Sequence, residues 1–224
     1  MVNSYLVLSI FPGIDLLGRA FEEAGYCVVR GPDLLWGGDI YTFHPPAGVF
    51  AGVIGGPPCK GESKARQYGG LKPLATLSHE FDRIVQEAAP DWWVMEAVIK
   101  HEAPYVVKLS PRWLGEKQSR RRYFHSNHDL EPYLEPALFE HPVFKHAVTA
   151  ANRAGKQGTV QRKVHSAFAT YSFREMCELQ GLPAGFELGG FTMKLKYEVV
   201  GNGVPLSMGR QIARAVEAAT RKEK

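Results

Sequence analysis

Gly55-Gly56-Pro57-Pro58-Cys59 is the stretch that decides the interpretation of this 224-residue chain. It follows residues 48–54, an apolar run typical of a buried strand. Its prolines cannot continue a central strand, because proline lacks the backbone N–H that the ladder needs. Its glycines allow a ligand to approach the backbone closely. The stretch therefore predicts a rigid turn at a strand end that presents the thiol of Cys59.

The cysteines divide into one candidate nucleophile and two packing residues. Lys60 follows Cys59 directly and favours the thiolate, which is the reactive form. A packing role for Cys59 is the alternative that this setting disfavours. Cys27 and Cys177 fall in an expected strand and an expected helix, so we predict that both are unreactive. Three scattered cysteines exclude a disulfide framework and a zinc knuckle.

Strand and helix patterns alternate on both sides of the turn. The β-rich apolar runs are residues 5–11, 26–29, 48–54 and 92–98. Apolar residues recur at helical spacing over residues 16–24, 77–89, 173–179 and 205–221. This alternation predicts an α/β fold built on a parallel sheet.

The composition is typical of a soluble globular protein of one domain with a small insertion. Apolar residues make up 45% and charged residues 22% of the chain. No apolar run approaches the roughly 18 residues that a membrane helix requires. The first residues lack the basic region of a signal peptide, so we expect a cytoplasmic protein without membrane contact. A formal net charge of +4 permits a polyanionic partner without demanding one.

Short motifs follow one another along nearly the whole chain outside residues 125–170. They are Phe11-Pro12-Gly13, Gly38-Asp39-Ile40, Gly56-Pro57-Pro58-Cys59, Leu77 with Arg83-Ile84, Glu96-Ala97-Val98, Gln118-Ser119-Arg120-Arg121-Arg122, Arg174-Glu175 with Leu179-Gln180-Gly181-Leu182-Pro183, and Tyr197 with Gly201-Asn202-Gly203-Val204-Pro205. In this order they resemble the signature of the DNA cytosine-5 methyltransferases, which use S-adenosyl-L-methionine. The resemblance implies a Rossmann-like methyltransferase sheet with a small inserted target-recognition subdomain.

The resemblance assigns catalytic roles to Cys59, Glu96, Arg120 and Arg122. Cytosine C5 is a poor nucleophile, and addition of the Cys59 thiolate to C6 makes C5 electron-rich. Glu96 is expected to share a proton with ring atom N3, and Arg122 to support O2. Arg120 is expected to help hold the site and the DNA, and its alternation with Arg122 along a strand puts both on one side. The target base must be flipped out of the duplex.

The resemblance also implies a set of cofactor-binding residues. Gly13 lets the backbone approach the methionine part, and Asp33 is a candidate acceptor for the ribose hydroxyls. Asp39 is expected to accept from the adenine amino group, with Ile40 packed on the ring, while Trp36 is a candidate for stacking on it. The remaining candidates are Phe11, Gly56, Pro58, Leu77, Asn202 and Val204.

Three segments divide the chain on this interpretation. Residues 1–124 form the catalytic, cofactor-binding domain, 125–172 the target-recognition insertion, and 173–224 a C-terminal return that completes the catalytic domain. The insertion is short, which suggests a compact member of phage or prophage origin with short or relaxed specificity. Double-stranded DNA is the expected partner of a monomer, and its expected contacts are Lys60, Ser63, Arg153, Lys156, Arg162 and Lys163.

Several residues depart from the family pattern. Asp15-Leu16 replaces a glycine pair, Lys60 and Glu62 replace the usual Gln and Phe, and Ala97 replaces Asn beside Glu96. An active enzyme remains the expectation, because the proposed nucleophile and acid are both present.

Alternative interpretations remain open. The substrate is RNA in one alternative, and in another the chain is a non-catalytic DNA-binding paralogue of the same fold. Taken alone, Glu96 is equally a strand-end ion-pair partner, and residues 120–122 are a solvated basic strand. His125 and His128 lack a neighbouring cysteine or a suitably spaced acid, so no metal is expected.

Overall fold

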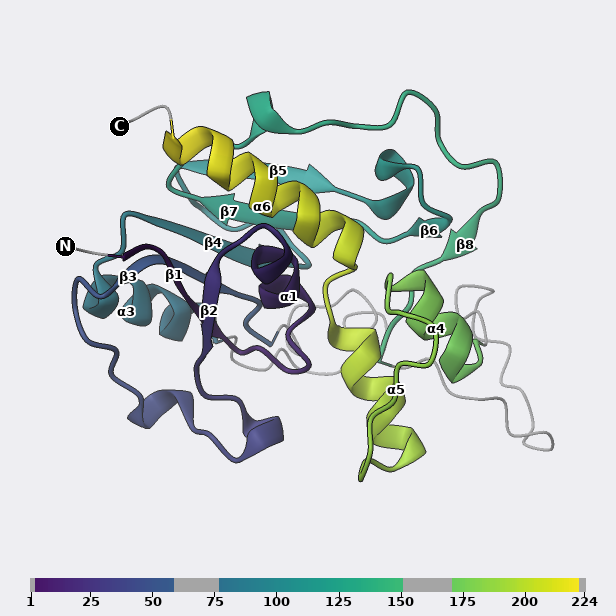
Figure 1. Cartoon of the computed structure of the whole chain (residues 1–224), viewed down its shortest axis with the longest axis horizontal. Helices are drawn as coiled ribbons and strands as arrows, with labels where there is room; N and C mark the ends of the chain where they lie inside the picture. The colour runs from purple at the N-terminus through teal and green to yellow at the C-terminus, as the bar shows by residue number, and fades with distance from the viewer. Residues whose placement is uncertain (1–2, 59–76, 151–170, 222–224) are drawn as a thin grey trace.

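The computed structural model describes residues 3–58, 77–150 and 171–221. A six-stranded sheet forms its centre, in the order β2-β1-β3-β4-β7-β5 (Figure 1). Its strands are β1 (Asn3–Ile10), β2 (Cys27–Arg30), β3 (Phe50–Gly55), β4 (Trp92–Ala97), β5 (Tyr105–Leu109) and β7 (Arg122–Ser126). The four strands expected from the sequence are all present, so the predicted α/β sheet is confirmed.

The sheet is mixed: most of its strands run parallel, as the sequence predicts, and one strand, β7, runs in the opposite direction. The pairs β1–β2, β1–β3 and β3–β4 are parallel, whereas β7 runs antiparallel to both β4 and β5. The connection from β5 to β7 contains only a 3₁₀ turn, η3 (Pro111–Leu114), and the short strand β6 (Gln118–Ser119). A parallel return needs a longer crossover, usually a helix, so this short connection brings the chain back in the opposite direction.

All four helices predicted from the spacing of apolar residues are present, and the structure has one further helix, α5 (Met193–Asn202). The four predicted helices are α1 (Leu16–Glu23), α3 (Ser78–Ala88), α4 (Phe173–Leu179) and α6 (Leu206–Arg221). Sequence periodicity did not predict α5, because its Lys-Leu-Lys-Tyr-Glu-Val run alternates like a strand and it ends in Gly-Asn. Shorter 3₁₀ turns are η1 (Leu34–Trp36), η2 (Ile40–Thr42) and η4 (Glu131–Tyr133).

Helices cover both faces of the sheet. Side chains alternate along β1, so Val7 packs with Phe21 of α1 and Ile212 of α6 on one face. The next residue, Leu8, packs with Phe81 of α3 on the other face. In Figure 1 the yellow α6 crosses the strands on the side of α1. This layered core fixes the strand ends at which the candidate site lies.

The predicted boundary at residue 125 falls inside a strand of the main sheet. Strand β7 continues to Ser126, and Leu130 is buried in the same core as α6. The polar run that begins at His125 suggested an insertion, but His125 and Ser126 are buried polar residues of the sheet. Farther on, β8 (Lys145–His146) pairs in parallel with β6. Residues 151–170, where the basic loop was predicted, lie outside the described residues.

Membrane-spanning helices are absent from the ranges 3–58, 77–150 and 171–221, where no helix is both long and apolar enough.

Candidate active site

Three strand ends meet at one edge of the sheet. Strand β3 ends at Gly55 and leads into Gly56-Pro57-Pro58, the turn before Cys59. The neighbouring strand β4 runs parallel to it, with Gly55 opposite Met95, so Glu96 lies beside the turn. Strand β7 runs the other way, so its first residue, Arg122, arrives at the same edge. The topology thus brings together residues that are far apart in the sequence.

Glu96 and Arg122 form an ion pair at this edge. Arg122 Nε lies 2.7 Å from Glu96 Oε1, and only 12% of the Glu96 side chain and 15% of the Arg122 side chain are exposed. A charge-assisted contact so far from solvent is screened less than a surface pair. Arg122 also donates through Nη1 to the carbonyl oxygen of Arg121, at 2.8 Å. The carboxylate is therefore held in a fixed position by the guanidinium.

Gly56 lies directly against the Glu96 carboxylate. A Cβ atom added at Gly56 would be 3.0 Å from Glu96 Oε2, closer than ordinary van der Waals contact. The glycine of the turn thus leaves room for the carboxylate. Cys59, Lys60 and Ser63 follow within a few residues but lie outside the described residues, so their roles stay predictions.

Arg120 faces a different part of the protein from Arg122, which corrects the prediction that they share one side. Its guanidinium is buried and donates through Nη1 to the carbonyl oxygens of Val148 and Gly201, the latter at 2.8 Å. The expected alternation fails because the chain is not in a strand at Arg120, between β6 and β7. In the structure Arg120 joins α5 to the segment between β6 and β7.

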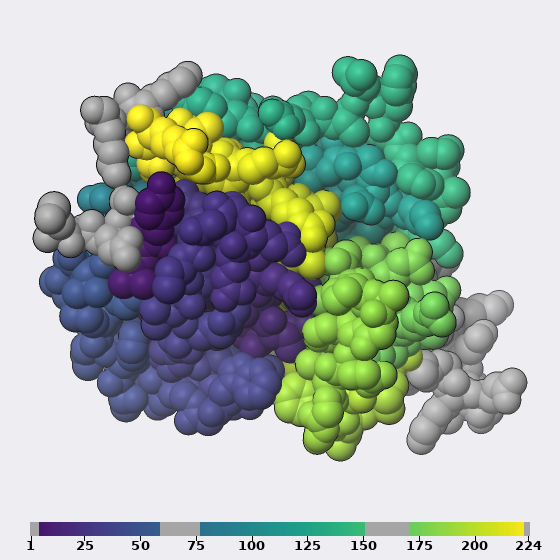
Figure 2. All heavy atoms as spheres, viewed as in Figure 1, coloured from purple at the N-terminus to yellow at the C-terminus, as the bar shows by residue number. Residues whose placement is uncertain are grey.

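Two buried glutamines, Gln118 and Gln180, add further hydrogen bonds between the same parts of the chain. Gln118 donates to the carbonyl oxygen of Leu179 at 2.7 Å and accepts from the backbone N–H of Val148 at 2.8 Å. Gln180 donates to the carbonyl oxygens of Val200 and Gly203, at 2.7 and 2.8 Å. Figure 2 shows α4 and α5 as a green lobe against the purple N-terminal half. The amide contacts explain how this lobe is fixed.

The turn after β1 has an unusual backbone. Phe11, Gly13 and Asp15 have φ values of 53°, 54° and 52°, in the left-handed region. Such a conformation is costly for Phe11, and it persists where the surroundings fix it, often at ligand sites. Gly13 donates to Asp33 Oδ2 at 2.9 Å, and its carbonyl accepts from Trp36 Nε1 at 2.7 Å. The turn is therefore held by two predicted cofactor residues.

Asp15 shows how the chain replaces a family glycine. Aspartate tolerates the left-handed region better than most residues, because its short side chain bonds locally. Its Oδ1 accepts from Ser9 Oγ at 2.8 Å and from the backbone N–H of Gly18 at 3.0 Å, which caps α1. Burial raises the pKa of Asp15, opposed by the Ser9 hydrogen bond and by Arg30, whose Nε lies 2.9 Å from Oδ2.

Several candidate cofactor residues share one apolar cluster. Phe11, Ile40 and Leu77 pack around Ile10 and Phe81 on the α3 face of the sheet. Asp39, next to Ile40, is the N-cap of η2 and accepts from the backbone N–H of Tyr41 at 3.0 Å. Pro58, at the end of the described part of the catalytic turn, is exposed.

The residues after α5 return to the start of α1. A Cβ atom added at Gly203 would lie 2.8 Å from Leu16 Cδ1, and Val204 is buried in a core that includes Leu17. Asn202 is exposed at the last turn of α5. The C-terminal candidates therefore lie near the start of α1, where Val204 contributes packing within the core.

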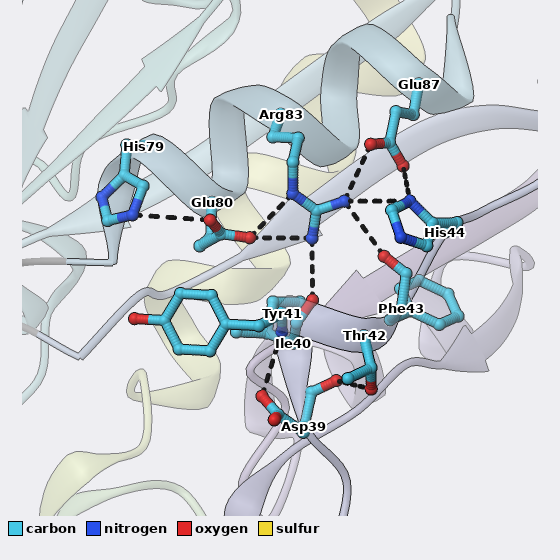
Figure 3. A network of polar contacts seen from close by, with 10 residues as sticks. All are labelled: Asp39, Ile40, Tyr41, Thr42, Phe43, His44, His79, Glu80, Arg83 and Glu87. Carbon is cyan, nitrogen blue, oxygen red and sulfur yellow. Dashed lines mark hydrogen bonds and ion pairs between the residues drawn. The ribbon is translucent and has the colours of Figure 1, made fainter.

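Trp36 and Arg83 have contacts that the sequence did not predict. Besides its bond to Gly13, Trp36 tilts against Phe191, with ring centroids 5.6 Å apart. Arg83 ties α3 to the segment that contains Ile40 (Figure 3). Its only sequence signal is its place in a motif, because acceptors on a distant turn leave no pattern.

His125 supports the strand end that carries Glu96. Its Nδ1 lies 3.2 Å from the carbonyl oxygen of Met95, and its Nε2 accepts from the backbone N–H of His101 at 2.9 Å. One nitrogen donates and the other accepts, which is the pattern of the neutral ring. Burial lowers the pKa of His125, in agreement with a neutral ring.

The described cysteines differ in accessibility. Cys27 is exposed, whereas Cys177 is buried. Burial raises the pKa of Cys177 to about 11, so its thiol stays protonated at neutral pH, in agreement with the prediction that it is unreactive. Within the described residues, no group of three or more His, Cys, Asp or Glu side chains lies close enough to hold a metal ion.

Comparisons with known proteins give one relative in sequence and many in structure. A search of protein-family models gives no match. The type II methyltransferase M.DdeI of Desulfomicrobium norvegicum is 26% identical in a part that covers 42% of this chain. That part is 28% of the relative, so the chain corresponds to well under two thirds of it.

Solved structures match nearly the whole chain. The S. pombe Dnmt2 methyltransferase gives a TM-score of 0.64 at 14% identity, covering 96% of this chain and 99% of that one. An E. coli prophage protein, described as a DNA modification methyltransferase, gives 0.63 at 16% identity, with the same coverage. The chain has the fold of these methyltransferases. The expected Rossmann-like methyltransferase sheet is thereby confirmed.

Proposed function

We propose that this chain is an S-adenosyl-L-methionine-dependent methyltransferase that methylates C5 of cytosine in double-stranded DNA through an adduct with Cys59. The observation that carries the proposal is the Glu96–Arg122 pair, packed against Gly56 in the turn that leads to Cys59. It joins a carboxyl group, a guanidinium and the approach to a thiol at the carboxyl ends of parallel strands, where α/β sheets bind ligands. The fold of the methyltransferase structures supports it.

The residues of the chain divide the chemistry between them. The Cys59 thiolate adds to C6 of the flipped base, and Glu96 shares a proton with N3, so the charge pushed into the ring is neutralised. Arg122 holds the Glu96 carboxylate and stabilises O2. After methylation C5 loses its proton, and the electron pair of that bond expels Cys59 from C6. Arg120 acts as a positioning residue through its contacts to Val148 and Gly201.

The residues around the β1 turn fit the cofactor. The turn from Phe11 to Asp15 holds non-glycine residues at left-handed φ, and Phe11 shares an apolar cluster with Ile40 and Leu77. When bound, the cofactor supplies the methyl group. Gly13 and Asp33 would hold its methionine and ribose parts, and the Asp39–Ile40 turn its adenine. The remaining candidates, which would complete the pocket, are Phe11, Gly56, Pro58, Asn202 and Val204.

A substrate assay with two cysteine variants tests the proposal. Purified chain is incubated with labelled cofactor and either duplex DNA or tRNA, and label is expected in cytosines of the DNA. Cys59→Ala should abolish the transfer, and Cys27→Ala is the matched control, because Cys27 is exposed and outside the site. Duplex DNA containing 5-fluorocytosine should trap a covalent adduct with the wild type and Cys27→Ala, because fluorine at C5 cannot leave as a proton.

The outcomes separate the alternatives. An adduct with Cys59→Ala would remove the proposed nucleophile. Label in tRNA and none in DNA would favour the RNA methyltransferase. Binding of DNA without any transfer would favour the non-catalytic paralogue.

A further inference from the structure

Arg83, in α3, makes polar contacts within the protein through all three nitrogens of its guanidinium (Figure 3). Its Nε and Nη2 lie 2.8 and 2.7 Å from Glu80 Oε2, and Nη1 lies 2.8 Å from Glu87 Oε1. It also donates to the carbonyl oxygens of Ile40 and Phe43, at 2.7 and 3.1 Å, and its Nη1 lies 3.5 Å from His44 Nδ1. The Arg83 side chain thus joins α3 to the segment around η2.

Asp39 and Arg83 together hold both ends of η2. The Asp39 carboxylate caps the N-terminal end by accepting from the backbone N–H of Tyr41. Arg83 holds the carbonyls of Ile40, the first residue of η2, and of Phe43, its C-cap. The Ile40 side chain is buried in the cluster beneath, so the backbone of the turn has little freedom.

The two glutamates orient the guanidinium toward these carbonyls. Glu80, which is buried, lies about one turn before Arg83 in α3, and Glu87 lies about one turn after it, so the two carboxylates contact the guanidinium from both sides. His44 adds a contact to Glu87 at 3.0 Å, which ties the segment after η2 to the same network. Lysine has the same charge but lacks the planar fork of donors, so it cannot make this set of contacts.

We infer that Arg83 is a positioning residue for cofactor recognition, which sets the Asp39–Ile40 turn at the place where the adenine ring binds. This inference rests on the proposed function. Without the Arg83 contacts the Asp39–Ile40 turn would sample other positions. Ordering the turn again on binding would then weaken the affinity for the cofactor. Loss of one or two polar contacts to the adenine is expected to weaken binding about 10- to 100-fold.

The test measures adenosyl ligands with Arg83→Met and Arg83→Lys. The dissociation constant for S-adenosylhomocysteine and the competitive inhibition constant of adenosine should both rise about 10- to 100-fold and by the same factor. The KM for the methyl donor should rise while kcat stays near that of the wild type, because ground state and transition state lose the same contact. Arg83→Lys keeps the positive charge but loses the planar set of donors, so it separates the effect of the carbonyl contacts from the effect of the charge.

Arg210→Met is the matched control. Arg210 also grips a glutamate with two nitrogens, since its Nε and Nη2 lie 2.6 and 3.2 Å from the carboxylate oxygens of Glu23, but it is on α6. It should leave both adenosyl constants unchanged. Folded Arg83 variants, verified by circular dichroism, that bind these ligands like the wild type would overturn the inference alone. Failure of the wild type to bind either ligand would overturn the proposed function together with it.

Discussion

Replacing Gly56 by alanine tests whether the catalytic turn and Glu96 must fit closely. The added Cβ would lie 3.0 Å from Glu96 Oε2, whereas ordinary contact begins at 3.4 Å, so the carboxylate must move by the difference, 3.4 − 3.0 = 0.4 Å. A shift of this size takes up most of the roughly 0.5 Å within which functional groups must stay, so we expect a partial loss of activity. A positioned acid contributes about 10²- to 10⁴-fold to the rate, and we expect Gly56→Ala to lose about tenfold of it.

Single-turnover methyl transfer to duplex DNA measures this loss, with thermal unfolding recorded in parallel. Gly189→Ala is the matched control, because the same added Cβ has no neighbour within 4 Å and the glycine is not in the left-handed region. It should transfer methyl groups at the wild-type rate. A rate for Gly56→Ala equal to that of Gly189→Ala would refute the close fit between the turn and the carboxylate.

Three further predictions concern the acid, the buried histidine and the DNA contacts. Glu96→Gln keeps a hydrogen-bond acceptor but cannot share a proton, so its rate of methyl transfer should fall about 10²- to 10⁴-fold; a rate near that of the wild type would make Glu96 purely structural. The pKa of His125 is lowered in the folded state, so the unfolded chain binds the extra proton, and the free energy of unfolding should fall as the pH drops below the ordinary value of about 6.5. Urea unfolding at several pH values should show that the free energy of unfolding depends less on pH in His125→Gln than in the wild type. An equal pH dependence would exclude His125 as its source. Replacing Lys156 and Arg162 by alanine should weaken binding to all duplexes and reduce the salt slope by about 0.9 for each lost phosphate contact; unchanged titrations would move DNA recognition elsewhere.

Elements with a strong periodic pattern could be predicted from the sequence. The apolar run before Gly55-Gly56-Pro57-Pro58 and the helical spacing of residues 173–179 both correspond to real elements. The local pattern was enough to predict these elements, because a buried face fixes the spacing of the apolar residues along the sequence. It failed for α5, whose alternating residues look like a strand, and for the direction of β7, which depends on the connection before it.

The candidate site was predictable as a set of residues but not as a set of contacts. Glu96 and Arg122 were both singled out, yet only the antiparallel register of β7 places them 2.7 Å apart. Arg120 looked equivalent to Arg122, and the break between β6 and β7 turns it toward two carbonyls instead. Side-chain direction at a strand end depends on tertiary packing, which a single sequence does not encode locally.

The contacts that fasten the C-terminal lobe have an evolutionary consequence. Gln118, Arg120 and Gln180 donate to backbone carbonyls, and an oxygen of the main chain is present whatever the side chain. The acceptors are Val148, Leu179, Val200, Gly201 and Gly203. Substitution at most of these positions leaves the acceptor in place, except at Gly201, where a Cβ would collide with the backbone of Thr149. Three donor side chains thus let the surrounding sequence diverge while the lobe keeps its place beside the proposed catalytic residues.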